Sequence, residues 1–214
     1  MIGILGGTFD PVHYGHLRPA LEVQQALGLD EIRCIPSHLP PHRSRPVATP
    51  QQRLAMLRAA VAGDSAFSID TREFEREGPS YTLDTLISLR EELGATGLCL
   101  LVGMDAFRGF TSWHRWREII DYAHIIVMTR PGSPSPAEGE LADFIARHRV
   151  KEVEALQGRS SGLLFYTPVT QLDISGTRIR KLIASGQRAD YLLPPGVLDV
   201  IRSEGLYAAG TGHG

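Results

Sequence analysis

Residues 1–16, MIGILGGTFDPVHYGH, decide the fold of this chain of 214 residues. The apolar run 1–5 is typical of a buried parallel strand, and the glycine pair 6–7 ends it. A turn through Asp10-Pro11 then leads to two histidines. The stretch predicts a strand, a glycine-rich turn and a following helix.

The start of the predicted helix follows from Pro19, because proline is tolerated in a first helical turn and breaks a helix interior. We therefore expect the helix to begin near Gly15 or His16, with one apolar face and a stop at Gly28. His13 and His16 would then lie in the last loop residues and the first helical turn.

This helix start is a candidate anion site. Free backbone N–H groups and the helix dipole favour an anion there, and two imidazoles three positions apart can face it together. Two histidines in a tight turn are, by themselves, more often surface residues, and a metal site lacks a third ligand at suitable spacing. The string matches neither GxGxxG nor GxxxxGK[ST], so it predicts a phosphate-binding turn of another kind.

The composition bounds the class of protein. A hydrophobic content of 43% over this length predicts one substantial core. The formal charge of −2 argues against a general nucleic-acid or membrane-surface binder. Cys34 and Cys99 lie in apolar runs, which fits a reducing compartment. The first residues already read as core strand rather than a signal segment, so we expect a cytoplasmic protein.

Short apolar runs alternate with helix-like stretches along the chain, which predicts a Rossmann-like, doubly wound parallel sheet with helices on both faces. Ligands of such sheets bind at the carboxyl ends of the strands, beside a topological switch point. After the first strand, we expect further strands at 32–36, 67–69, 98–102, 124–128 and 163–166.

Polar residues follow several of these strands. The proline-rich loop 36–46 carries His42, Thr82 lies near a predicted helix start, and Arg130 directly follows a strand. Solvent exposure and helix capping would also explain the first two. Trp113 follows a strand-end loop and is the better of the two tryptophans for stacking on a flat ring.

Residues 167–183, TPVTQLDISGTRIRKLI, predict a second helix start at this edge. Ser175 or Thr177 can cap that helix, and Arg178 and Arg180 lie in its first turns. The segment could hold a polyphosphate, although a capped helix with basic neighbours is common.

Together these motifs resemble the nucleotidylyltransferase superfamily. GGTFDPVHYGH matches its HxGH loop, whose histidines contact the phosphates of ATP or CTP, and ISGTRIR resembles its ISSTxIR motif, with Gly176 in place of a serine. The resemblance covers nearly the whole chain and is closest to the bacterial nicotinate mononucleotide adenylyltransferases. The segments that carry it further are PPH, PSYTLDTL, VGMD with the tryptophan loop, HIIVMTRPG and YLLPPGVLDVIRSEGLY.

The resemblance implies roles for individual residues. Thr82 and Trp113 would hold the nicotinate ring, Asp105 would contact the sugar or phosphate, and His114 stands where some relatives have tyrosine. The implied catalytic residues are His13, His16 and Arg180. The implied ATP contacts are Gly6, Gly7, Thr8, Phe9, His13, His16, Ser175, Thr177 and Arg180. The implied nicotinate-nucleotide contacts are His42, Thr82, Asp105, Trp113, His114 and Arg130.

The implied reaction is adenylyl transfer from ATP to nicotinate mononucleotide in NAD biosynthesis, with Mg²⁺ on the triphosphate and no metal bound by the protein alone. An anionic phosphate nucleophile needs no protein base. The alternatives are another HxGH enzyme, with a nicotinamide mononucleotide or pantetheine-phosphate acceptor, and a nucleotide-binding sensor without turnover. We expect one domain over residues 1–207 and a flexible tail over 208–214, and the oligomeric state stays open.

Overall fold

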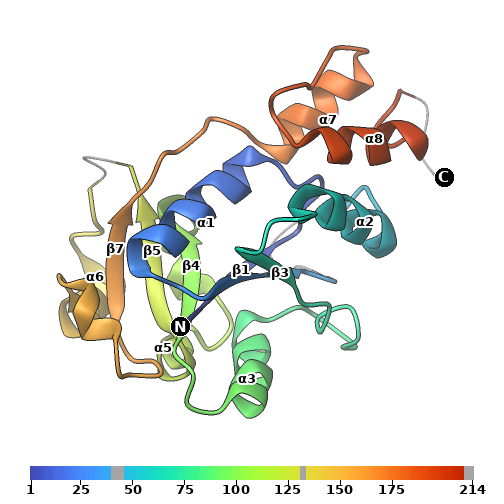
Figure 1. The fold of residues 1–214 in the computed structure, drawn as a ribbon. Coiled ribbons are helices and arrows are strands. Elements are labelled where there is room, and N and C mark those ends of the chain that lie inside the picture. Colours follow the sequence, from blue (N-terminus) through green and yellow to red (C-terminus); the bar gives the residue numbers. More distant parts are fainter. Residues whose placement is uncertain (40–45, 131–133, 210–214) are drawn as a thin grey trace.

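The computed structural model describes residues 1–39, 46–130 and 134–209, and within them a seven-stranded, fully parallel sheet (Figure 1). The strand order is β3-β2-β1-β4-β5-β7-β6, which confirms the predicted doubly wound sheet. The strands are β1 (Ile2–Gly7), β2 (Glu31–Pro36), β3 (Phe67–Ile69), β4 (Leu98–Gly103), β5 (His124–Thr129), β6 (Arg149–Val150) and β7 (Leu164–Pro168).

Helices cover both faces of the sheet (Figure 1). One core layer contains α1 (Tyr14–Leu27), α2 (Pro50–Val61), α7 (Gly176–Ala184) and α8 (Pro195–Ser203). The other contains α3 (Thr82–Leu93), α4 (Met104–Arg108), α5 (Ile119–Tyr122) and α6 (Gly139–His148). Three short 3₁₀ turns complete the described structure: Phe110–Ser112, Trp116–Glu118 and Val153–Leu156.

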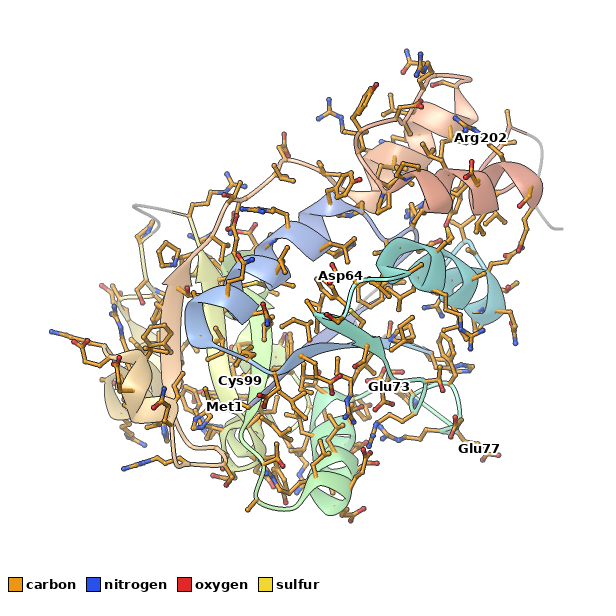
Figure 2. All side chains as sticks on the ribbon, in the orientation of Figure 1. Met1, Asp64, Glu73, Glu77, Cys99 and Arg202 are labelled. Atoms are coloured by element: carbon orange, nitrogen blue, oxygen red, sulfur yellow. The ribbon has the colours of Figure 1, made fainter. Side chains whose placement is uncertain are left out.

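The two-residue period of β4 explains the two layers. Cys99 and Leu101 face one core layer, whereas Leu98, Leu100 and Val102 face the other, and all five are buried. Figure 2 labels Cys99 within the sheet. Burial raises the pKa of both cysteine thiols to about 12, so each behaves as a small apolar side chain.

The boundaries of α1 differ from the prediction. The helix begins at Tyr14, one residue earlier than expected, so Pro19 lies in its second turn and the placement of Pro19 in the first turn was wrong. His13 has extended backbone and its carbonyl accepts hydrogen bonds from the amides of His16 and Leu17, which closes the first turn. Pro19 is buried, so core packing offsets the backbone hydrogen bond that it cannot make.

The carboxyl half of the chain contains two elements that the sequence pattern did not indicate. β6 has only two residues, too few for a periodicity, and pairs with the outer side of β7. From its composition of glycine, serine and proline, the stretch GSPSPAEGE at residues 132–140 predicts a surface loop, but α6 already begins at Gly139, and residues 132 and 133 lie outside the described part. Among the described residues, we find no helix that combines the length and the apolar character needed to cross a bilayer.

Arg90 of α3 ties together three segments at the amino ends of the strands. Its guanidinium donates to the backbone carbonyls of Gly94, Thr96, Tyr122 and Ser160 at 2.6 to 2.9 Å. These residues precede β4, β5 and β7. The carbonyls cannot bond to one another, so a planar donor with five N–H groups is needed to satisfy them together.

We predict that Arg90→Met lowers the free energy of unfolding by about 2 to 4 kcal/mol, because four carbonyls lose a charged donor. Arg117→Met is the matched control, because Arg117 pairs with Glu140 only at the exposed surface. Its effect should stay below about 1 kcal/mol. Urea unfolding of both variants measures the difference, and equal effects would contradict the bracing role of Arg90.

Candidate active site

Residues 8–16, which we call the histidine loop, lead from β1 into the first turn of α1 at the carboxyl end of a central strand. The rings of His13 and His16 stack, with centroids 3.8 Å apart and planes inclined by 26°. The backbone N–H of His13 donates to Nδ1 of His16 at 3.3 Å. Since Nδ1 therefore accepts, the neutral form of the His16 ring carries its proton on Nε2 and presents a donor there.

His13 is only 5% exposed, and burial lowers its pKa to about 4. The ring is consequently neutral at pH 7. Its Nδ1 has no hydrogen-bond partner among the residues that the structure describes. Burying a polar atom without a hydrogen-bond partner costs free energy, so we infer that a ligand or a water molecule bonds to this Nδ1 atom.

Glycine at position 15 allows the second half of the site to reach this loop. A Cβ atom there would lie 2.9 Å from Nδ1 of His13 and 3.1 Å from the carbonyl oxygen of Ile174. The chain before α7 therefore packs directly against Gly15, beside the His13 ring. Ser175 caps α7 by accepting a hydrogen bond from the amide of Arg178 at 3.2 Å, so the predicted helix start is confirmed.

The start of α7 also contacts Asp10. A Cβ atom on Gly176 would lie 2.8 Å from the carbonyl oxygen of Asp10, so a side chain there would force the two segments apart. The guanidinium of Arg180 donates to that same carbonyl at 2.6 Å and to the hydroxyl of Thr177 at 3.4 Å. The glycine that departs from the superfamily motif is thus explained by a close approach of backbones.

A pocket opens on the other side of the β1 end. Gly6 and Gly7 line it together with Ser37, Thr82 and Trp113. Apolar side chains of β1, β2, α3 and β4 form its deeper walls. Thr82 and Trp113, which the family resemblance placed on one ring-binding surface, therefore line the same pocket. Gly6 and Gly7 connect this pocket to the histidine loop.

A buried carboxyl group supports this pocket. Glu73 accepts a hydrogen bond from the hydroxyl of Thr85 at 2.7 Å, and burial raises the pKa of Glu73. Ser80 accepts hydrogen bonds from the amides of His38 and Leu39, which holds the chain after β2 against the start of α3. Figure 2 labels the buried Glu73 and the exposed Glu77, both on the connection between β3 and α3.

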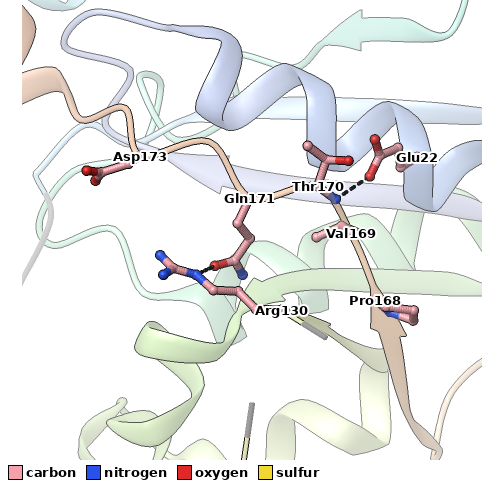
Figure 3. A pocket seen from close by; sticks show the side chains of 7 residues that line it. All are labelled: Glu22, Arg130, Pro168, Val169, Thr170, Gln171 and Asp173. Carbon is pink, nitrogen blue, oxygen red and sulfur yellow. Dashed lines mark hydrogen bonds between the residues drawn. The ribbon is translucent and has the colours of Figure 1, made fainter. Parts of the chain in front are cut away.

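Arg130 lies in a separate open pocket of about 510 Å³ at the ends of β5 and β7, beside α1 (Figure 3). Its Nε donates to Gln171 at 2.5 Å, and the amide of Thr170 donates to Glu22 at 2.6 Å. Asp173 also lines this pocket. Arg130 therefore does not share a pocket with Thr82 and Trp113.

The remaining predicted residues are more peripheral. Asp105 is largely exposed at the start of α4, where it accepts a hydrogen bond from Arg108 at 3.0 Å. The His114 ring stacks on Tyr81 at 4.2 Å, beside the helix that carries Thr82. His42 lies outside the described residues.

Sequence reasoning missed the buried polar residues behind the site. Arg53 is fully buried, donates to the carbonyl of Thr8 at 2.7 Å and lies over the ring of Phe74. Tyr207 and Glu73 are also buried and bonded to polar partners. No local pattern signals these contacts, although Tyr207 stands in a segment that carried the family resemblance.

This geometry defines a nucleotide-binding α/β protein: a histidine loop at the switch point, a capped helix facing it and a pocket on either side. Comparison with known proteins narrows the class. Residues 4–182 match the family model described as cytidylyltransferase-like. A relative from Aeromonas hydrophila, named "Probable nicotinate-nucleotide adenylyltransferase", is 50% identical over 96% of each chain. One of the same name from Methylococcus capsulatus is 50% identical over 97% of this chain and 100% of the relative.

Solved structures agree at the level of the fold. The nicotinic acid mononucleotide adenylyltransferase of Plasmodium falciparum complexed with NaAD has a TM-score of 0.71 at 18% identity, over 96% of each chain. The same protein complexed with APC gives 0.70 at 16% identity, again over 96% of each chain. The chain belongs to the cytidylyltransferase-like family and, within it, to the nicotinate-nucleotide adenylyltransferases.

The burial of His13 predicts a pH dependence of stability. Its pKa is about 4 in the folded chain and near 6.5 in the unfolded chain, so the unfolded chain binds the proton more readily. The stability contributed by the neutral ring is complete above pH 6.5 and is lost as the pH falls from 6.5 to 4, by at most about 3 kcal/mol. His13→Asn should reduce this loss in urea unfolding measured across that range.

His114→Asn is the control for this prediction, because His114 is exposed. Burial also lowers the pKa of His124, but that residue is present in every variant and cancels in the comparison. An unchanged pH dependence in His13→Asn would show that His13 is not held neutral by the fold.

Proposed function

We propose that this chain transfers the adenylyl group of ATP to nicotinate mononucleotide, giving nicotinate adenine dinucleotide and pyrophosphate. One observation carries the proposal: Gly6 and Gly7 separate the histidine loop from the pocket of Thr82 and Trp113, so a phosphate and a flat ring can be held side by side. The names of the close relatives and the NaAD complex of the Plasmodium falciparum protein support this reading.

The reaction needs an in-line geometry more than it needs a base. A phosphate oxygen of the mononucleotide attacks the α-phosphorus of ATP, the bond from that phosphorus to the bridging oxygen breaks, and pyrophosphate leaves with the electron pair. The attacking oxygen is already anionic, so no proton has to be removed from it. Holding two anions in line contributes roughly 7 to 11 kcal/mol in favourable cases.

The two histidines suit this task for different reasons. His16 has its Nδ1 occupied by the amide of His13, so Nε2–H is the group that can donate to a phosphate oxygen. His13 is neutral and buried, and it supplies a fixed polar atom without a full charge. Such preorganised donors stabilise the negative charge that develops on the α-phosphate and the leaving group.

The segment around α7 would take the remaining phosphates. Ser175, Thr177 and Arg180 lie at its start, where free N–H groups and the helix dipole favour anions. Gly6, Gly7, Thr8 and Phe9 would supply close backbone contact to ATP from the opposite side. Arg180 is held against Asp10 in the ligand-free chain, and we propose that it donates to the triphosphate when ATP binds.

The acceptor would occupy the pocket beside Gly7. We propose that the pyridine ring stacks on Trp113 and that the start of α3 at Thr82 binds the ring carboxylate, with the His114 backbone beside it. Asp105, His42 and Arg130 remain proposed contacts of the sugar and phosphates. We place Arg130 beside the phosphates rather than the pyridine ring, because it lines the pocket between α1 and the end of β7 and not the pocket of Thr82 and Trp113.

We propose that Mg²⁺ accompanies ATP as part of the substrate. Magnesium that arrives with a nucleotide keeps several waters and binds mainly through the phosphate oxygens. Among the described residues, no three histidine, cysteine, aspartate or glutamate side chains gather as a metal-binding group. When bound, the ion would screen the negative charge of the triphosphate.

The test is pyrophosphate release by the purified protein with ATP and Mg²⁺, comparing nicotinate mononucleotide, nicotinamide mononucleotide and phosphopantetheine. We expect strong preference for the nicotinate acceptor. Release with phosphopantetheine alone would keep the histidine chemistry and reject the ring pocket. Binding of ATP without release for any acceptor would identify a nucleotide sensor instead.

We predict that His16→Ala lowers kcat by roughly 100-fold to 1000-fold, because one preorganised donor to the transferred phosphoryl group is lost. Far-UV circular dichroism should show an intact fold. His148→Ala is the control, because His148 lies on α6 and lines neither of the two pockets. Turnover close to that of the unmodified chain would remove His16 from the mechanism.

A further inference from the structure

The carboxylate of Asp10 is a buried junction between segments distant in the sequence. It is 7% exposed, and it accepts hydrogen bonds from the amides of Val47 at 2.8 Å and Ala48 at 3.2 Å. The hydroxyl of Tyr207 donates to the Asp10 Oδ1 atom at 2.6 Å, and the Arg180 guanidinium lies 3.7 Å from Oδ2. We call this group the Asp10 junction.

Tyr207 reaches the junction from beyond α8. Its side chain is 6% exposed, packs in the same core layer as α1 and α2, and lies 3.8 Å from the sulfur of Met56. Burial and the neighbouring carboxylate raise the pKa of its phenol, so the hydroxyl keeps its proton and is the donor. A neutral donor on a carboxylate makes a short, charge-assisted hydrogen bond.

Asp10 in turn sets the position of α7. The carbonyl of Asp10 accepts the 2.6 Å hydrogen bond from Arg180, and Gly176 lies so close to this carbonyl that a Cβ atom would be 2.8 Å away. The same aspartate therefore contacts the first residue of α7 and its arginine through the backbone, and Tyr207 through the carboxylate.

Removing the phenol hydroxyl would change what Arg180 does. Oδ1 would lose its shortest hydrogen bond, and the nearest movable cation is the Arg180 guanidinium. The other nearby arginine, Arg53, is fully buried and held by its hydrogen bond to the carbonyl of Thr8, although its Nε and Nη2 atoms have no partner among the described residues. Arg180 would then move onto the carboxylate and away from the phosphates, because a buried anion that keeps only the amides of Val47 and Ala48 as donors is less well compensated.

We propose that Tyr207 is a positioning residue for the triphosphate site, holding the Asp10 carboxylate so that Arg180 and the start of α7 stay available to ATP. This inference rests on the proposed function. The hydroxyl touches no reacting atom and acts only through Asp10.

The test compares Tyr207→Phe with Tyr191→Phe. Both tyrosines lie in the carboxyl-terminal segment with positive φ (64° and 65°), but Tyr191 is 89% exposed. We expect Tyr207→Phe to lower kcat by about tenfold, the factor that corresponds to one charge-assisted hydrogen bond. The KM for ATP should rise while the KM for nicotinate mononucleotide stays within about twofold, a split between the two substrates that a loss of folded protein would not give. Tyr191→Phe should match the unmodified chain.

Gly176→Ala is the second variant and decides the case if Tyr207→Phe does not fold. Alanine is well tolerated in helices, but its Cβ would push the start of α7 from Asp10 and should lower kcat in the same way. The inference is overturned if the folded variants keep the kcat of the unmodified chain and change only its melting temperature.

Binding measurements separate this inference from the proposed function. If the unmodified chain releases no pyrophosphate with any acceptor, the proposed function fails, and titration calorimetry with ATP tests the junction alone. Weaker ATP binding by Tyr207→Phe than by Tyr191→Phe would support the junction. Equal ATP affinities in that assay would overturn it.

Discussion

The hydrogen bonding of β1 to two parallel neighbours is the constraint on which the site depends. β2 lies on one side of β1 and β4 on the other, and the chain winds away from β1 in opposite directions. The connections after β1 and β4 therefore diverge and leave a crevice above the end of β1. The histidine loop occupies this crevice, and the pocket of Thr82 and Trp113 opens beside it.

Within that crevice, backbones approach closely because two side chains are absent. Gly15 leaves room for both the His13 ring and the carbonyl of Ile174, and Gly176 lets α7 reach the carbonyl of Asp10. The His13 ring beside Gly15 is only 5% exposed. This burial, rather than a neighbouring charge, is what keeps His13 neutral.

The sequence predicted the parallel sheet, the histidine loop and a capped helix start at Ser175 or Thr177, because each follows from a local pattern of apolar, glycine and cap residues. It also brought Thr82 and Trp113 together through the family resemblance. It did not predict that His13 is buried, because burial is set by tertiary packing around the loop, where the carbonyl of Ile174, far along the chain, lies against the nearby Gly15. Pro19 was misplaced for a similar reason: core packing outweighed a local rule.

The contacts of the Asp10 junction have a consequence for synthesis of the chain. The carboxylate of Asp10 accepts its shortest hydrogen bond from Tyr207, which is translated 197 residues later. Close to the junction, the amide of Tyr14 likewise donates to the carbonyl of the distant Leu192. A nascent chain can form the early strands as they leave the ribosome, but it cannot complete the loop that the first strand carries. The loop after β1 is thus translated early and completed last, and a chain that ends before Tyr207 lacks the contacts that complete it.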